Sequence, residues 1–268
     1  MSYQEMLPDV QLQAYVRCIW TIDEDHSDAD SHESATPDSY IELISNLGGS
    51  CHVQGENESR LPDVCLVGLQ DKPLMFRVSG ITKIVGVRFY PWGVLPFKGL
   101  FMPPLNSLPV ALDAKWDALS AVLKPMTQTN TFQEIAARVE LFLLSHFRHE
   151  QPDSDLAQVQ EAGSRLYATN GQTRIDDLAA YCGFSSRQLE RQFKALAGVS
   201  PKKLARAIRF EMIALRLFTN PAMNLLDLAY EFGYADQAHF IHDFKAFAQL
   251  TPGDFAEAMR SYTMQSAP

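Results

Sequence analysis

The segment 186–194 combines an apolar stripe with a polar and mostly basic surface. Leu189 and Phe193 lie four residues apart, so one side of a helix there is apolar and the rest is free to face a partner. That free surface carries Ser186, Arg187, Glu190, Arg191 and Lys194. Side chains of these types bond to base edges in a major groove and bind phosphates. We therefore expect this surface to contact double-stranded DNA.

Turn and capping signals predict that this helix is the second of a helix-turn-helix unit. Thr173, with Asp176 three residues later, is typical of a helix start. Gly183 lies where the chain must leave that first helix with a positive φ, which glycine adopts at little cost. Ser185 is a favoured N-cap for the next helix, and Gln188 can complete a capping box.

The same unit occurs twice in the chain. Residues 177–184 read DLAAYCGF and residues 227–234 read DLAYEFGY, and each copy is followed by a Phe-Lys pair. The offset between the copies is 50 residues up to the glycine-aromatic pair and 51 residues after it. A repeat this close indicates one supersecondary unit used twice.

On these residues the C-terminal half resembles the AraC/XylS family of bacterial transcription regulators. The resemblance also rests on the connection 198–201 and on the start of a joining helix at 206–209, and it covers roughly residues 155–258. It implies a sequence-specific regulator that binds double-stranded DNA, with RNA polymerase as a further partner.

The joining helix is expected from about Pro201, a suitable first-turn residue, to about Phe218. About eighteen residues at 1.5 Å each span roughly 27 Å, which is comparable with the 34 Å between successive major-groove faces. One chain could then place both recognition helices on the same side of a duplex, with a bend or tilt making up the difference. Lys202, Lys203 and Arg206 are expected nearer to phosphates.

The second recognition helix is expected from Asp236 to about Ala248. Its outward candidates are Gln237, Ala238, Ile241, His242, Asp243 and Lys245. Ala238 and Ile241 suit a thymine methyl group, and Gln237 suits adenine. Where the family often carries arginine, this chain has His242, which is neutral at pH 7 at its ordinary pKa. We therefore expect the second unit to bind DNA weakly.

Charge is divided unevenly along the chain, whose net charge is −9. Residues 1–170 carry 12 Lys and Arg against 22 Asp and Glu, whereas residues 171–216 carry 9 against 4. Residues 217–268 carry 2 against 6. The basic surface is thus confined to the first helix-turn-helix unit and the joining helix, which favours phosphate binding there.

Residues 1 to about 92 predict a β-rich domain. Apolar residues alternate with mostly polar ones from Leu12 to Ile22, the period of a half-buried strand. Further short strands are expected at 40–47, 64–69, 74–78 and 81–90, with turns at 48–49, 71–73 and 80. Such a pattern favours a barrel or sandwich. Residues 36–44 and 85–93 look like the cupin-type barrel that precedes the DNA-binding half in many such regulators.

Helices are expected after Trp92, one at 110–124 and one from a capping box at Thr131 and Glu134 to about His149. The second of these helices has apolar residues outside its main stripe, namely Leu141, Leu144 and Phe147. Such a helix either lies in the core alone or also packs against a second copy of the chain.

The polar, proline-containing segment 151–154 is the expected domain boundary. The expected fold class is α+β with two domains, each long enough to bury its own core. Residues 1–150 form a β-rich, cupin-like sensing or dimerisation domain with following helices. Residues 151–268 form an all-α domain of two helix-turn-helix units joined by a long helix.

Two groups of residues contain metal-ligand types. The acidic stretch 23–33 contains two histidines, but nothing would pre-organise its ligands, so a solvated loop is favoured over a metal site. His146, His149 and Glu150 are assigned to a helix-end cluster rather than to a metal. The cupin metal pattern, two histidines one residue apart and then a glutamate, is absent. We expect neither a metal nor another cofactor.

A small effector is a further possible partner of the N-terminal half. The candidate lining residues of its pocket are Trp20, Tyr40, Arg88, Tyr90 and Trp92, although aromatic residues are more often core residues. Two alternatives stay open, an N-terminal half that only forms a homodimer and a barrel that performs enzyme chemistry. Because no nucleophile-base pair or metal constellation is visible, we do not expect an enzyme.

The four cysteines, Cys18, Cys51, Cys65 and Cys182, show no spacing typical of zinc sites or disulfides. Free buried thiols are favoured, with a redox pair among the first three as the alternative. There is no run of 18 apolar residues, and the N-terminus lacks the regions of a signal peptide. We therefore expect a cytoplasmic protein that does not bind membranes.

Overall fold

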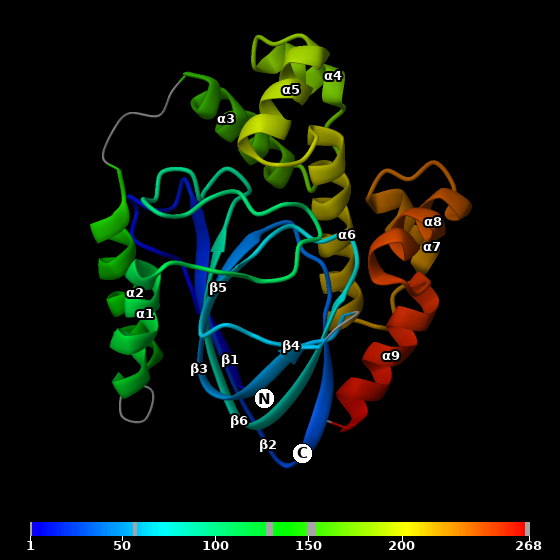
Figure 1. Ribbon diagram of the computed structural model, residues 1–268. Coiled ribbons are helices and arrows are strands. Elements are labelled where there is room, and N and C mark those ends of the chain that lie inside the picture. Colours follow the sequence, from blue (N-terminus) through cyan, green and yellow to red (C-terminus); the bar gives the residue numbers. More distant parts are fainter. Residues whose placement is uncertain (1, 56–57, 127–130, 149–153, 266–268) are drawn as a thin grey trace.

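The computed structural model describes residues 2–55, 58–126, 131–148 and 154–265. Its first half is a curved β-sheet with two helices beside it, and its second half is helical (Figure 1). The strands are β1 (Ser2–Met6), β2 (Val16–Ala35), β3 (Ile41–Val53), β4 (Ser59–Arg60), β5 (Val64–Val67), β6 (Leu74–Phe89) and β7 (Val110–Ala111).

The helices of the first half are α1 (Ala114–Leu123), the 3₁₀ helix η1 (Lys124–Met126) and α2 (Phe132–His146). Those of the second half are α3 (Ser154–Ala168), α4 (Ile175–Tyr181), α5 (Ser186–Leu196), α6 (Pro201–Thr219), α7 (Leu225–Glu231), α8 (Gln237–Ala248) and α9 (Pro252–Gln265). The predicted α+β class is confirmed.

The sheet has the order β1-β2-β6-β3-β5-β7, with β4 on β3, and the pairings of the described strands are antiparallel. Three strands are much longer than predicted. The expected turns at 48–49 and 80 are irregularities inside β3 and β6, where Gly49 has a φ of 69° and Gly80 a φ of 74°. A glycine with positive φ serves a bulge as well as a turn, so the sequence pattern did not separate the two.

The acidic stretch 23–33, predicted as a solvated loop, is instead part of β2. Its backbone pairs with β6 as far as Ala35, opposite Leu74, with a register shift between His26 and Ser31. The polar side chains that favoured a loop are compatible with a strand because one side of the strand faces away from the core.

Successive side chains along the three long strands, β2, β3 and β6, point to opposite faces of the sheet, and the two faces differ in their surroundings. Ile19, Leu43 and Val87 belong to the buried core that also contains residues of α1 and α2. Trp20 and Arg88 follow Ile19 and Val87 directly in sequence, and they point to the opposite face. One face is thus covered by helices and the other is available for a binding site.

The helices after the sheet follow the predictions in part. The capping box of Thr131 and Glu134 is confirmed at the start of α2. The helix predicted at 110–124 begins only at Ala114, because Asp113 caps it and residues 110–111 pair with β5. Leu141 is exposed, whereas Leu144 and Phe147 are half-buried. His149, Glu150 and residues 151–153 of the predicted boundary lie outside the described residues.

The tandem helix-turn-helix arrangement is confirmed, with α4 and α5 in the first unit, α7 and α8 in the second, and α6 between them. Gly183 has a φ of 71°, and Ser185 forms the predicted capping box with Gln188. The predicted cap by Thr173 is wrong. Arg174 is the N-cap of α4 without a side-chain bond, and the Thr173 hydroxyl instead lies 2.8 Å from Thr169 Oγ1.

The hydrophobic core is not split into two parts at residues 151–154, where the domain boundary was expected. One continuous core runs from Leu12 in the β-rich half to Ile208 in α6, and a second surrounds Phe240 of the second unit. Helix α3 therefore joins the first helix-turn-helix unit to the β-rich half. Gly163 permits close contact there, because a Cβ on it would lie 1.9 Å from Trp92 Cζ3.

Candidate DNA interface and ligand cavity

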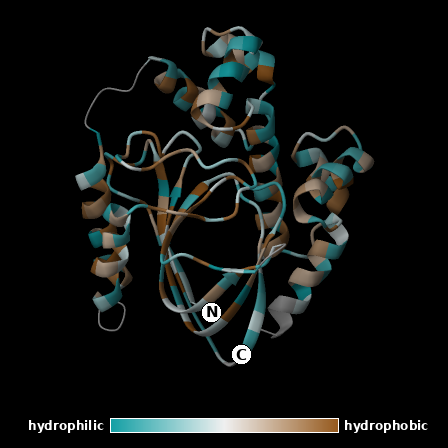
Figure 2. Cartoon of the chain, viewed as in Figure 1, coloured by the Kyte–Doolittle hydropathy of each residue, from teal (hydrophilic) through white to brown (hydrophobic). Residues whose placement is uncertain are grey.

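The outer surface of α5 presents the five side chains predicted to contact DNA. Leu189 and Phe193 are fully buried beneath the helix. Exposed on the other side are Ser186, Arg187, Glu190, Arg191 and Lys194. Figure 2 shows hydrophilic residues on the outer turns of α4 and α5. The sequence pattern and the fold thus agree on which side of α5 is free.

Two of these side chains already have surface partners. Lys194 Nζ lies 2.9 Å from Glu190 Oε1, and Ser186 Oγ donates to Asp176 Oδ1 at 2.7 Å. Such exposed contacts contribute little in water and can be exchanged for contacts with DNA. Within the described part of the chain, Arg187 and Arg191 have no ion-pair partner.

The basic residues at the start of α6 lie in three different environments. Lys202 is exposed, as a phosphate contact requires. Lys203 Nζ is 2.6 Å from Asp71 Oδ2, which belongs to the β-rich half. Arg206 Nη2 is 2.6 Å from Asp243 Oδ1 of α8. Lys203 and Arg206 are therefore engaged within the chain, so a phosphate would have to displace a carboxylate from each.

The surface of α8 carries less charge than that of α5. Its exposed candidates are Gln237, Ala238, His242 and Lys245, while Ile241 is half-buried. The prediction that Asp243 faces outward is wrong, because Asp243 is 5% exposed. It accepts hydrogen bonds from Arg206 and, at 2.8 Å, from the Tyr234 hydroxyl, so its carboxylate joins α6 to the second unit.

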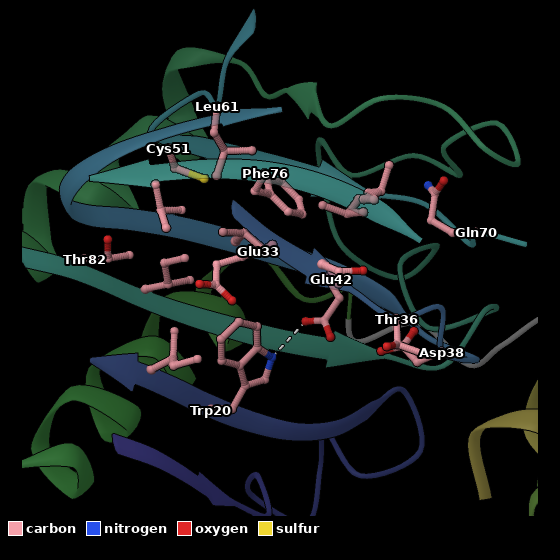
Figure 3. A pocket seen from close by; sticks show the side chains of 18 of the residues that line it. Trp20, Glu33, Thr36, Asp38, Glu42, Cys51, Leu61, Gln70, Phe76 and Thr82 are labelled. Atoms are coloured by element: carbon pink, nitrogen blue, oxygen red, sulfur yellow. Dashed lines mark hydrogen bonds between the residues drawn. The ribbon is translucent and has the colours of Figure 1, made fainter. Parts of the chain in front are cut away.

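A cavity of about 420 Å³ lies on the face of the sheet opposite the one that packs with α1 and α2. Its volume falls within the usual range of small-molecule sites, about 300–1,000 Å³. The apolar part of its wall comprises Ile22, Ile44, Leu61, Val67, Leu74, Phe76, Val78 and Ile84. Figure 3 shows side chains from several strands pointing into this space.

Three of the five predicted pocket residues, Trp20, Tyr40 and Arg88, line this cavity. Tyr90 and Trp92 do not, which corrects the prediction. Strand β6 ends at Phe89, and the chain then turns under α3, where the rings of Tyr90 and Trp92 stack with centroids 5.1 Å apart. These two aromatic residues are packing residues between the halves.

Trp20 and Arg88 are held in the cavity wall by Glu42. The Trp20 indole donates to Glu42 Oε2 at 2.8 Å, as Figure 3 shows, and Arg88 Nε donates to Glu42 Oε1 at 2.8 Å. The indole lies against Gly86, its neighbour on β6, where a Cβ would be only 2.2 Å from Trp20 Cε2. Only glycine leaves room for the ring at that position.

One end of the cavity is connected to the helical half. Asp38 lines the cavity, and burial, together with the nearby carboxylates of Glu42 and Glu211, raises its pKa. The next residue, Ser39, donates to Glu211 of α6. Burial also raises the pKa of Glu211. The segment beside the cavity and the joining helix therefore each carry one desolvated acid where they meet.

The sequence reading missed the carboxylates of the cavity wall, those of Glu24, Glu33, Asp38 and Glu42. A signal was present for Glu42, because it interrupts the otherwise apolar run from Tyr40 to Ile44. A charged side chain on a buried strand needs a partner or a ligand.

The three cysteines of the sheet are buried, as predicted, and Cys182 is half-buried. Burial raises the pKa of Cys51 to about 11 and that of Cys65 to about 12. Such thiols are poor nucleophiles at neutral pH. In the described residues, no three metal-ligating side chains gather at one point. Among the described helices, none combines the length and the apolar character that a membrane span requires.

Comparison with known proteins matches the two halves separately. Residues 165–258 match a family described as a helix-turn-helix domain, and residues 4–108 match a domain of unknown function, DUF6597. The chain is 33% identical over 81 residues to the HTH-type transcriptional regulator MtrA of Neisseria gonorrhoeae, an alignment that covers 30% of this chain and 27% of MtrA.

A second relative and one solved structure are also similar to the chain. The chain is 32% identical over 84 residues to the probable transcription factor PqrA of Proteus vulgaris, covering 31% of this chain and 68% of PqrA. Among solved structures, ToxT of Vibrio cholerae aligns over 96% of this chain and 98% of its own, at 13% identity and a TM-score of 0.48.

Proposed function

The chain belongs to the AraC/XylS family of transcription regulators, and we propose that it binds double-stranded DNA with α5 in a major groove. The observation that carries this proposal is the exposure of Arg187 and Arg191 within the basic stretch 171–216. Arginine pairs with guanine through two hydrogen bonds, which gives base discrimination. Ser186 and Glu190 add hydrogen-bonding groups on the same surface.

The second unit makes a weaker contact in this proposal. Helix α6 has 19 residues, and at 1.5 Å per residue it spans roughly 28 Å, close to one helical repeat of DNA. The exposed surface of α8 holds one lysine, Lys245, beside Gln237, Ala238 and His242. Specificity would therefore come mainly from α5, with α8 adding contacts in the neighbouring groove.

The cavity of the β-rich half takes a small effector that modulates DNA binding. Support comes from its position, because Asp38 in its wall is followed by Ser39, which bonds to α6. Residues 1–150 then form the sensing domain and residues 151–268 the DNA-binding domain. A second copy of the chain and RNA polymerase complete the proposed partners, and the cytoplasm is the compartment that holds all of them.

Selection of duplexes from a random pool by the full-length protein tests this function. The proposal predicts enrichment of one motif, about two helical turns long if α8 contributes and about one turn long if only α5 does. Enrichment that the double variant Arg187→Ala/Arg191→Ala retains would contradict the assignment of α5. No enrichment by the protein, alone or with a ligand of the cavity bound, would contradict sequence-specific binding itself.

A further inference from the structure

The charge of the cavity wall is strongly one-sided. Four carboxylates line it, those of Glu24, Glu33, Asp38 and Glu42, against the single guanidinium of Arg88. Their formal charges sum to −3. His26 also lines the cavity, but its Nε2 already lies 3.5 Å from Glu24 Oε2. A positively charged ligand group would therefore be attracted by the wall as a whole. A negatively charged ligand group would be repelled by it.

Arg88 is committed to the protein's own acids. Its Nε bonds to Glu42 at 2.8 Å and lies 3.8 Å from Asp38 Oδ2. Its Nη1 lies 3.7 Å from Glu5 Oε2. A ligand carboxylate would therefore compete with three protein carboxylates for one guanidinium. The cavity is for this reason poorly suited to an anionic ligand.

Two of the acids are partly removed from water. The side chain of Glu42 is 12% exposed and that of Asp38 is 25% exposed. Burial and neighbouring acids raise the pKa of Asp38, which means that its negative charge is insufficiently compensated by Arg88. A cation placed beside these two groups would supply the missing compensation.

Aromatic rings line the same cavity as these acids. They are those of Trp20, Tyr40 and Phe76, and such rings attract cations, as Trp20 does with the Arg88 guanidinium, which lies 5.7 Å from its ring centroid. The remainder of the wall is aliphatic, so the rest of a ligand would have to be apolar. Carboxylates and aromatic rings in the wall of a largely apolar space are the chemistry that recognises an organic cation.

A buried hydroxyl gives a second and independent sign of a ligand. Thr82 lines the cavity and is 4% exposed, and its Oγ1 has no hydrogen-bond partner among the described residues. In Figure 3, Thr82 and Asp38 lie at opposite ends of the cavity. A buried polar atom without a partner is costly, and a polar group on a ligand would satisfy it.

We propose that the effector of this cavity is an organic cation, with an ammonium group beside Glu42 and Asp38, an apolar body along the aliphatic wall, and a polar group at the Thr82 end. The ligand class rests on the proposed role of the cavity as the effector site. The residues that define it are all in the β-rich half, so the binding of such a ligand can be measured without DNA.

Calorimetric titration of the full-length protein with three probes of similar size tests the ligand class. The probes are 4-phenylbutylamine, which is a cation at neutral pH, the neutral 4-phenylbutan-1-ol, and the anion 4-phenylbutanoate. We expect the amine to bind at least about tenfold more tightly than the alcohol and the anion to bind weakest. Tighter binding of the anion, equal binding of all three, or no binding of the amine would overturn the proposal.

Variants separate a charge effect from a general loss of structure. Glu42→Gln and Asp38→Asn keep the size of each side chain, and each should weaken amine binding about fivefold or more and weaken alcohol binding clearly less, so that the preference for the amine falls. Glu33→Gln serves the same purpose if the Arg88 partners are needed for folding, because no contact with Arg88 involves Glu33. Glu257→Gln, exposed on α9, is the matched control.

The two proposals fail in different ways. A protein that binds the amine but selects no DNA contradicts the regulatory function and leaves the cavity chemistry standing. A protein that selects a DNA motif but does not prefer the amine over the alcohol contradicts only the ligand class. Amine affinity that Glu42→Gln, Asp38→Asn and Glu33→Gln all leave unchanged would place the binding outside this cavity and overturn the proposal.

Discussion

Glu211 of α6 accepts two hydrogen bonds from Ser39, one from its backbone N–H at 3.1 Å and one from its Oγ at 2.6 Å. The Ser39 carbonyl in turn accepts a bond from the Tyr167 hydroxyl of α3 at 2.7 Å. Since Ser39 follows Asp38 of the cavity wall, one residue joins the cavity to two helices of the DNA-binding half. Through this contact, a shift of Asp38 on effector binding would be transmitted to α6.

Ser39→Ala should weaken the contact between the halves. It removes the Oγ donor from a desolvated carboxylate, so we expect the free energy of unfolding to fall by about 1–3 kcal/mol. Chemical denaturation of the full chain measures the change. Ser164→Ala, at an exposed position of α3, is the control and should stay within about 0.5 kcal/mol of the original protein. Equal stability of the two variants would show that the contact contributes nothing.

Glu211 should also make stability depend on pH. Because burial raises its pKa above the ordinary value of 4.5, its contribution to stability is present below that pH and is lost as the pH rises through the folded-state value. Glu211→Gln carries no charge, so its unfolding free energy should fall less steeply above that pH than that of the original protein. Denaturation across a pH series measures both profiles, with Glu257→Gln as control. Parallel profiles for Glu211→Gln and the original protein would contradict this.

Gly163→Ala tests the packing of α3 on the β-rich half, because close packing predicts that the substitution lowers the stability rather than raising it. Alanine usually stabilises a helix relative to glycine by about 0.5–1 kcal/mol. At this position the new Cβ would lie 1.9 Å from Trp92 Cζ3, so we expect destabilisation by about 1–3 kcal/mol instead. Gly253→Ala in α9, whose nearest neighbour would be 3.8 Å away, should be neutral or stabilising. Melting temperatures above that of the original protein for both variants would mean that α3 does not pack closely on Trp92.

Asp71→Asn should release Lys203 for DNA. The Lys203 ammonium lies 2.6 Å from Asp71 in this structure, so loss of the carboxylate leaves a free cation at the start of α6. We expect tighter binding of random duplexes and a salt dependence of log K that is steeper by about one phosphate contact. The substitution Lys203→Gln added to Asp71→Asn should reverse both effects, while Asp117→Asn, exposed on α1, should have neither. An unchanged salt slope for Asp71→Asn would place Lys203 away from the phosphates.

Features that depend on neighbouring residues could be predicted from the sequence. The Ser185 capping box, the positive φ of Gly183 and the extent of α6 each follow from residues within one or two helical turns. Even there, the cap assigned to Thr173 was wrong, because its hydroxyl has a competing partner in Thr169.

Features that depend on distant pairing could not be predicted in the same way. The stretch 23–33 becomes a strand only because β6 lies beside it, with Asp23 opposite Lys83 and Glu33 opposite Phe76. The contact between Ser39 and Glu211 joins residues 172 positions apart, and no local pattern signals it. Trp20 and Arg88 line the cavity as predicted because they lie on strands that present alternate side chains to it, whereas Tyr90 and Trp92 follow the end of β6, where strand alternation no longer applies.

The central claim is that α5 recognises base sequence, and the affinity of Arg191→Ala tests it most directly. Binding of the full-length variant is measured by fluorescence anisotropy on the duplex selected by the original protein and on a random duplex of equal length. Arg138→Ala, at an exposed position of α2, is the control. We expect Arg191→Ala to lose about 1–3 kcal/mol of binding free energy on the selected duplex and much less on the random one. Affinities of Arg191→Ala for both duplexes equal to those of the original protein would contradict the claim.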